Sequence, residues 1–141
     1  EGEMNIAAVL IYDRALDETE RQQVEGFLQT KYISDPNNTA PVAADDAFSV
    51  SEDGILNGDV LADNGNGVDN DPDGDPLSVN TTLVDDVDNG TLLLNSDGTF
   101  TYTPDPGFFG VDEFIYEVFD DLGETDQALV TITVDENTFV I

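Results

Sequence analysis

The distribution of charge is the feature that most restricts how this chain can fold. From Ala40 to Ile141 the sequence contains 24 Asp and Glu residues and no Lys, Arg or His. Like charges at this density repel one another and destabilise a compact state, so folding requires bound divalent cations or concentrated salt. The same charge excludes nucleic acid and anionic membrane surfaces as partners, because both are themselves negatively charged.

The composition of the chain excludes several classes of site. Its 141 residues are 39% hydrophobic and 9% aromatic, which is enough for one full-sized domain with a hydrophobic core. The absence of Cys and His excludes disulfides, zinc sites, thiol nucleophiles and imidazole bases. No apolar stretch reaches the ~18 residues that span a bilayer, so membrane insertion is not expected.

The first 32 residues have the pattern of a strand followed by a helix. Asn5–Tyr12 is apolar on both alternating faces, which predicts a strand buried on both sides. Asp17 and Glu20 form a D-x-x-E capping box, and an apolar stripe that includes Val24 follows it. A piece of this size cannot bury a core of its own.

These residues also carry a family resemblance. The segment IAAVLIYDRALDETERQQVEGFLQTKY resembles the last strand and the C-terminal helix of bacterial laminin-G-like, concanavalin-type lectin domains. The resemblance implies that residues 1–32 end a lectin-like domain whose remainder precedes Glu1. An ordinary strand and helix at the start of the following domain is the alternative.

Beyond a polar, Pro-containing linker at residues 33–40, the pattern becomes all-β. Asn95–Gly98 predicts a hairpin turn between Thr91–Leu94 and Thr99–Thr103. A second predicted hairpin pairs Phe114–Phe119 with Ala128–Val134. We therefore expect a mainly β fold, a cadherin- or immunoglobulin-like antiparallel β-sandwich of about seven strands over residues 41–136, with 137–141 as an exit linker or tail.

The densest chemical feature is the acidic run from Asp69 to Asp75, which has a carboxylate at every second position and ends in the sequence Asp73-Gly74-Asp75. Hard oxygen ligands at this spacing, with a Gly for the turn, suit Ca²⁺, which takes six to eight oxygens at about 2.3–2.6 Å. An EF-hand is excluded, because its closing position is Asn80 instead of Glu and no helices flank the loop. A solvated acidic loop is the alternative.

The region from Pro41 to Val134 resembles the tandem cadherin-like repeats of bacterial giant adhesins and related exoproteins. The matching motifs, in order, are NTAPVAADD, SEDG, GDVLADN, DPDGDPLSV, GTLLLNSDGTFTYTPDPGFFGVDEFIYEVFDDLG and ALVTITV. Extra residues around Gly65 to Asp69 depart from the commonest form of the repeat. The resemblance implies calcium sites at the two poles of the sandwich, where successive domains meet.

The resemblance assigns a ligand set to each pole. At the entry pole the family positions fall on linker amides, on the D-x-D pair with its alternative partner, and on the aspartates before the last strand; these are Asn37, Asn38, Asp71, Asp73, Asp75, Asp120 and Asp121. At the exit pole they fall on an early glutamate, a mid-domain acid and a linker acid; these are Glu52, Asp112 and Asp135. For the second set, ordinary surface carboxylates or turn caps are the alternative.

Together these features predict a non-catalytic module of a large surface or secreted, adhesin-like protein, located outside the cell, in which Ca²⁺ stiffens the domain junctions. Its expected partners are neighbouring domains of the same chain or identical subunits, with carbohydrate as a further candidate. The alternatives are an extracellular filament subunit that exchanges the strand Asn5–Tyr12, a carbohydrate-binding module, and halophilic acidity that only retains hydrated salt. Gly74-Asp75-Pro76 lacks the His of known self-cleavage sequences, so self-cleavage is not expected.

Overall fold

The computed structural model describes residues 17–24 and 37–137. Contacts divide the chain into two compact units, Glu1–Pro36 and Asn37–Ile141. Four predicted features or parts of them, namely Asn5–Tyr12, the helix beyond residue 24, the linker residues 33–36 and residues 138–141, lie outside the described residues. No described helix is long and apolar enough to cross a membrane.

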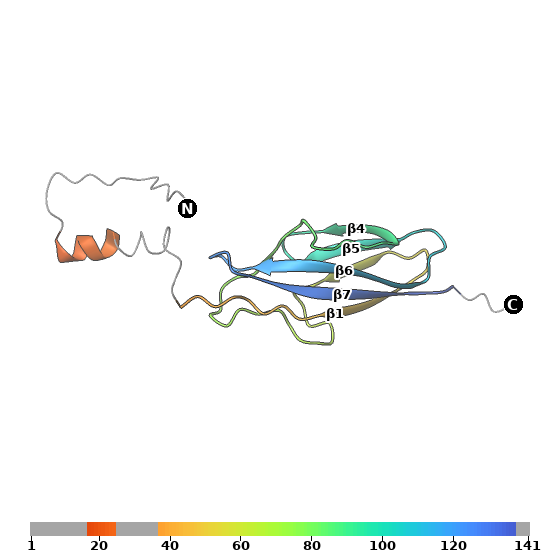
Figure 1. Cartoon of the computed structure of the whole chain (residues 1–141), viewed down its shortest axis with the longest axis horizontal. Coiled ribbons are helices and arrows are strands. Elements are labelled where there is room, and N and C mark those ends of the chain that lie inside the picture. The colour runs from red at the N-terminus through yellow and green to blue at the C-terminus, as the bar shows by residue number, and fades with distance from the viewer. Residues whose placement is uncertain (1–16, 25–36, 138–141) are drawn as a thin grey trace. The chain divides into compact units, whose positions relative to one another are not determined.

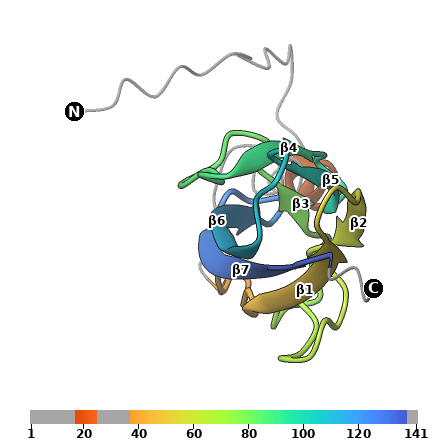
Figure 2. The same ribbon diagram turned by 90° about the vertical axis from the view of Figure 1, so that its right-hand side faces the viewer.

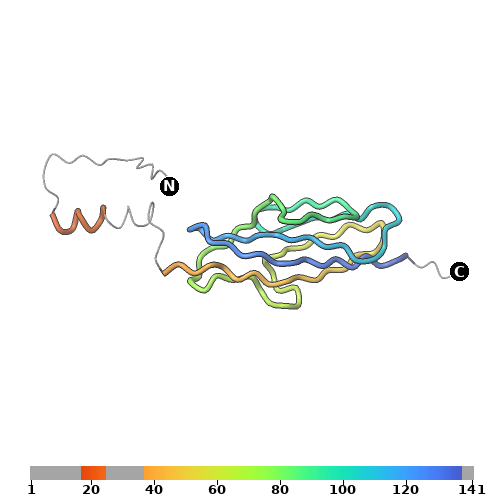
Figure 3. Tube along the Cα trace, viewed as in Figure 1, coloured from red at the N-terminus to blue at the C-terminus, as the bar shows by residue number. Residues whose placement is uncertain are grey.

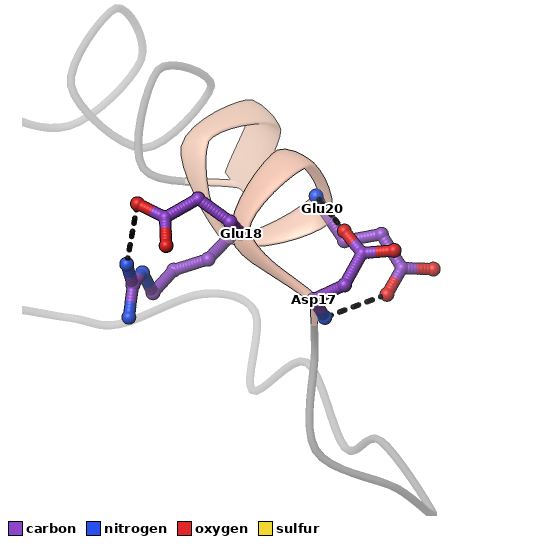
Figure 4. A network of polar contacts seen from close by, with 4 residues as sticks. Asp17, Glu18 and Glu20 are labelled. Atoms are coloured by element: carbon purple, nitrogen blue, oxygen red, sulfur yellow. Dashed lines mark hydrogen bonds and ion pairs between the residues drawn. The ribbon is translucent and has the colours of Figure 1, made fainter.

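Residues 18–24 of the first unit are helical, and the predicted capping box is confirmed. The Asp17 backbone N–H donates to Glu20 Oε2 at 3.1 Å, and the Glu20 N–H donates to Asp17 Oδ1 at 2.8 Å (Figure 4). This reciprocal pair satisfies two amide donors that a helix N-terminus otherwise leaves open. Glu18 and Arg21 form an ion pair at 3.1 Å on the helix surface.

The second unit is a β-sandwich of seven strands in two sheets, which confirms the predicted fold class (Figures 1 and 2). One sheet has the order β1-β7-β6-β3 and the other has the order β2-β5-β4. The strands are β1 (Asp46–Ser51), β2 (Leu56–Asp59), β3 (Ser78–Val79), β4 (Gly90–Leu94), β5 (Thr99–Pro104), β6 (Gly110–Phe119) and β7 (Thr125–Asp135).

Both predicted hairpins are confirmed. β4 and β5 pair antiparallel around the turn at Asn95–Gly98, and β6 pairs antiparallel with β7 along its whole length. Gly98 takes a left-handed φ of 89° in this turn, and a Cβ there would lie 2.7 Å from Leu61 Cγ, so only glycine fits. One pair departs from the predicted antiparallel arrangement. β1 pairs parallel with β7, from Asp46 opposite Val130 to Ser51 opposite Asp135.

The core forms between the two sheets from strand residues that alternate inward. Phe100 and Tyr102 of β5 are buried while the threonines beside them face outward, and β6 and β7 alternate in the same way. The rings of Phe48 and Phe114 pack edge-on against Phe100, with centroids 5.0 and 5.5 Å from it. Phe109, by contrast, is 55% exposed.

Candidate functional site

Three segments meet at the end of the sandwich where the chain enters it (Figure 3). They are the entering residues Asn37–Thr39, the loop Asp69–Pro76 between β2 and β3, and the turn Asp120–Glu124 between β6 and β7. We call the seven residues predicted here, Asn37, Asn38, Asp71, Asp73, Asp75, Asp120 and Asp121, the acidic pole. The family resemblance assigned them to one site although they come from segments that are up to 84 positions apart.

Hydrogen bonds hold the entering segment of the chain to the acidic pole. Asn38 Nδ2 donates to Asp120 Oδ2 at 2.7 Å, and the Thr39 backbone N–H donates to Asp73 Oδ2, also at 2.7 Å. Both acceptors are carboxylates, which make stronger hydrogen bonds than neutral oxygens do. The segment that joins this domain to what precedes it is therefore fixed by the same side chains that were predicted to bind the cation.

Asp71 organises the acidic loop. Its Oδ1 accepts hydrogen bonds from the backbone N–H groups of Asp73 at 2.7 Å and Asp75 at 3.4 Å, which is the Asx turn expected of this residue type. Gly74, with a left-handed φ of 85°, lets the loop close. Asp71 thus holds its own loop with one carboxylate oxygen and leaves the other one available.

Two oxygens of the acidic pole are buried and lack a donor. Among the described residues, Asn38 Oδ1 and Asp71 Oδ2 are the buried side-chain polar atoms without a hydrogen-bond partner. Leaving a buried acceptor unsatisfied costs on the order of 1–3 kcal/mol, so such atoms are rare in folded proteins and are usually met by a bound water or ion where the protein supplies no donor. Both of them belong to the residue set that the sequence assigned to calcium.

The electrostatics of the acidic pole reflect the crowding of its carboxylates. The pKa of Asp75 is raised, first by desolvation and then by the charges of Asp121, Asp71, Asp73 and Asp120. Desolvation also acts on Asp120, but hydrogen bonds from Asn38 and from the N–H groups of Glu124, Gly123 and Leu122 outweigh it and lower its pKa. The acidic pole therefore carries several negative charges close together.

The carboxylates of the acidic pole lie near one another but do not point at one common position. Within residues 17–24 and 37–137 no three acidic side chains lie close enough together to hold a metal ion as they stand. The donor set of the acidic pole consists of oxygens alone, and together with the two donorless oxygens it fits a hard cation such as Ca²⁺.

The residues predicted for the exit pole are placed differently. The Glu52 backbone N–H donates to the Asp135 carbonyl at 2.7 Å, and Glu52 Oε2 accepts from the Asn137 N–H at 3.2 Å. Asn137 Nδ2 also donates to the Glu52 carbonyl at 2.7 Å. Glu52 and Asp135 are thus neighbours where the chain leaves the sandwich, and Glu52 serves to fix the exit segment.

Asp112 faces the interior instead of joining Glu52 and Asp135 at the surface. It is 3% exposed and accepts hydrogen bonds from the Tyr102 hydroxyl at 2.8 Å and from the N–H groups of Asp88 and Asn89, both at 3.0 Å. Burial and then this carboxylate raise the pKa of Tyr102. In these contacts Asp112 secures the segment before β4 to the core. Its position in the inward alternation of β6, with Phe114 and Tyr116, was the sequence signal for burial.

A second buried carboxylate cluster was not predicted from the sequence. Asp69 and Asp46 are 7% and 3% exposed, and their Oδ2 atoms lie 2.8 and 3.4 Å from the Tyr116 hydroxyl. Asn64 Nδ2 donates to Asp46 Oδ1 at 3.0 Å. The pKa of Asp46 is raised to about 6, first by burial and further by the nearby charge of Asp69. Hydrogen bonds from Asn64 and Tyr116 offset the effect of burial only in part. Asn64 and Asp69 belong to the loop in which the sequence showed extra residues.

The fold and the acidic pole define the class of protein as a β-sandwich module with oxygen-rich ends. The family model of the bacterial cadherin-like domain matches residues 38–136. The chain therefore belongs to the bacterial cadherin-like domain family, which confirms the cadherin-like part of the resemblance. No curated protein matches the chain.

Several solved structures are similar to the chain. One is a nucleoside hydrolase-related hypothetical protein from Saccharophagus degradans associated with carbohydrate metabolism, with a TM-score of 0.49, 17% identity, and coverage of 70% of this chain and 26% of that protein. Two endo-fucoidan hydrolases of glycoside hydrolase family 107 have TM-scores of 0.47 and 0.46, with 20% and 21% identity. They cover 74% and 71% of this chain, which spans 15% and 16% of their length.

Proposed function

We propose that this chain is a non-catalytic, calcium-stiffened repeat module of a large extracellular protein, in which it acts as a spacer or adhesion scaffold. Membership of the bacterial cadherin-like family supports an extracellular repeat. The proposal that no catalysis occurs is supported by the absence of Cys and His from the sequence, which removes thiol nucleophiles and imidazole bases. The aromatic side chains of Phe100, Tyr102, Phe114 and Tyr116 are buried and so are unsuited to stacking on sugars.

The observation that carries the calcium proposal is the pair of buried, donorless oxygens, Asn38 Oδ1 and Asp71 Oδ2. A cation at the acidic pole would supply the positive partner that these oxygens lack. It would also offset the repulsion between carboxylates that, after desolvation, raises the pKa of Asp75. Asp120 Oδ2 accepts a hydrogen bond from Asn38 Nδ2, and Asp73 Oδ2 accepts one from the Thr39 N–H. Both carboxylates therefore lie beside the entering segment that carries Asn38.

The mechanical consequence follows from where the acidic pole lies. Asn38 and Thr39 are the residues through which the chain enters the sandwich, so a cation bound to Asn38 and to the loop would fix the direction of the entering segment. Without the cation, the segment is held by hydrogen bonds to mutually repelling carboxylates. Calcium would therefore set the stiffness of the junction as well as the stability of the module.

Isothermal calcium titration of the whole chain tests this function. We expect saturable binding at micromolar to millimolar calcium, and we expect Asp73→Asn to weaken it by about tenfold or more, because it removes one of the charges that attract the cation. Asp97→Asn is the matched control, since Asp97 also precedes a turn glycine but lies at the β4–β5 turn; it should leave binding unchanged.

Two results would contradict the proposal. One is the absence of calcium binding together with a thermal stability and small-angle scattering profile that do not change on chelation. The other is stability that rises with KCl and ignores calcium, which would identify the acidity as halophilic adaptation.

A further inference from the structure

Strand β4 forms one margin of the second sheet and has a neighbour, β5, on one side only (Figure 2). The turn bond from the Asn95 N–H to the Thr99 carbonyl fixes which residues face β5, since hydrogen-bonded pairs alternate along an antiparallel ladder. Leu93 and Thr91 therefore direct their backbone groups toward β5, and Leu92 and Leu94 direct theirs outward. Among the described residues, no hydrogen bond is made by the backbone groups of Leu92 or Leu94 on that outer side.

This edge lacks the protection that other edges of the molecule have. β4 has the sequence GTLLL, without a charge or a proline, which are the usual devices against pairing with another strand. By contrast, the edge strand β2 carries Asp59. At the edge strand β1, the loop after β2 approaches its start, where Asn66 Nδ2 donates to the Asp45 carbonyl at 2.8 Å.

A groove of about 660 Å³ runs beside the free edge. Residues Thr81–Leu83 and Asp86 line one side of it, and Leu92–Leu94 line the other. Leu93 is 63% exposed. The groove thus combines open backbone hydrogen-bonding groups with apolar side chains, which are the two components of recognition by strand addition.

We propose that the edge of β4 binds an extended segment of a partner protein in which apolar and basic residues alternate. The backbone of that segment would pair with Leu92 and Leu94, and its apolar side chains would enter the groove. The basic residues follow from charge complementarity, because Asp86 lines the groove, Asp85 and Asp88 lie within two residues of it in the sequence, and no residue from Ala40 onward is basic. A second copy of this chain is disfavoured as the occupant, since its net charge is also −29.

The test uses the whole chain and a short fluorescein-labelled peptide that alternates lysine and valine, with binding followed by fluorescence anisotropy. We expect saturable binding that weakens as salt is added. Leu93→Lys should weaken it about tenfold or more, because it places a positive charge on the edge. Ile55→Lys is the matched control, since Ile55 is 65% exposed and lies outside β4; it should change the affinity by less than about twofold.

Two further measurements separate strand addition from simple charge attraction. A peptide N-methylated at every residue keeps its charges but has no backbone N–H group to pair with the edge, so it should not bind. Hydrogen exchange at the Leu92 and Leu94 amides should be fast in the free chain and slow in the complex.

Several outcomes would overturn the proposal. Equal binding of the N-methylated peptide would mean that charge alone attracts it, and equal binding of a glutamate–valine peptide would refute charge complementarity. Amides of Leu92 and Leu94 that are already protected in the dilute free chain would show that the edge is not open. Self-association that Leu93→Lys abolishes would assign the edge to a second copy instead.

Discussion

The two ends of the sandwich both carry predicted aspartates, and they differ in what those aspartates bind. At the exit end, Asp112 is buried and receives hydrogen bonds from a tyrosine hydroxyl and two backbone N–H groups. At the entry end, Asp71 Oδ2 and Asn38 Oδ1 are buried without any donor. The difference shows that a buried acidic residue marks a candidate cation site only when protein donors leave its oxygens unsatisfied.

Removal of the Asp112 side chain should have the largest effect on stability. Asp112→Ala should lower the free energy of unfolding by about 3–5 kcal/mol, because it leaves the Tyr102 hydroxyl and the N–H groups of Asp88 and Asn89 without their acceptor inside the protein. The loss should be the same in calcium and in chelator, measured by urea unfolding. Asp135→Ala, at an exposed position, should change stability by about 0.5 kcal/mol or less. A loss seen only in calcium would make Asp112 a ligand after all.

The opposite behaviour is expected of Asp71. Asp71→Asn keeps an oxygen for the N–H groups of Asp73 and Asp75 but replaces the donorless carboxylate oxygen with an amide nitrogen. A ligand present at 100 times its Kd stabilises a protein by about 2.7 kcal/mol, and Asp71→Asn should abolish this gain. Stability in chelator should stay the same or rise, because one repelling charge is removed.

Calorimetric melting with and without calcium measures both effects of Asp71→Asn. The matched control is Asp53→Asn, at an exposed turn residue whose left-handed φ of 61° asparagine also adopts. It should retain the full calcium gain. If Asp71→Asn also retained it, the donorless oxygen would have no part in calcium binding.

Asp46 provides an intermediate case, buried like Asp112 but crowded by Asp69. Its pKa is raised from 3.8 to about 6 in the folded chain, so between these pH values the folded state holds a proton that the unfolded state has lost. Stability in chelator should therefore fall by about 2 kcal/mol as the pH rises from near 4 to above 6. The contribution is fully present below the unfolded pKa and absent above the folded one.

The Asp46→Asn variant isolates this effect from other titrating groups. Asp69 and Asp75 also have raised pKa values, whereas Asp97 and Asp120 have lowered ones, and all four are common to both proteins. The difference between the two pH profiles, measured by urea unfolding, should therefore show the Asp46 contribution alone. Parallel profiles would mean that Asp46 is ionised throughout this range.

The sequence predicted the features that depend on local pattern. The turn residues Asn95–Gly98 predicted the hairpin with its second strand at Thr99–Thr103, and the D-x-x-E sequence predicted the helix cap. Gly74, expected as the turn residue of the acidic run, has a left-handed φ of 85°. These features could be predicted because each is determined by neighbours along the chain.

The features that the sequence missed depend on contacts between distant residues. Tyr116 meets Asp69 across 47 positions and Asp46 across 70, and no local pattern encodes such a pairing. The parallel pairing of β1 with β7 is likewise a property of the assembled sheet. The repeat motif assigned Asp112 to the exit pole, with an ordinary surface carboxylate as the alternative, but it is 3% exposed because it lies on the inward side of β6.

The smallest expected effect comes from Glu52, the other residue assigned to the exit end. Its side chain accepts one hydrogen bond, from the Asn137 N–H at 3.2 Å, on the exposed exit segment. Glu52→Ala should therefore cost about 0.5 kcal/mol and leave the calcium titration unchanged, because water can replace an exposed acceptor. A fall in the number of calcium ions bound, with the acidic pole intact, would show that the exit end also holds a cation. In that case the two ends would differ in their affinity for the cation and not in kind.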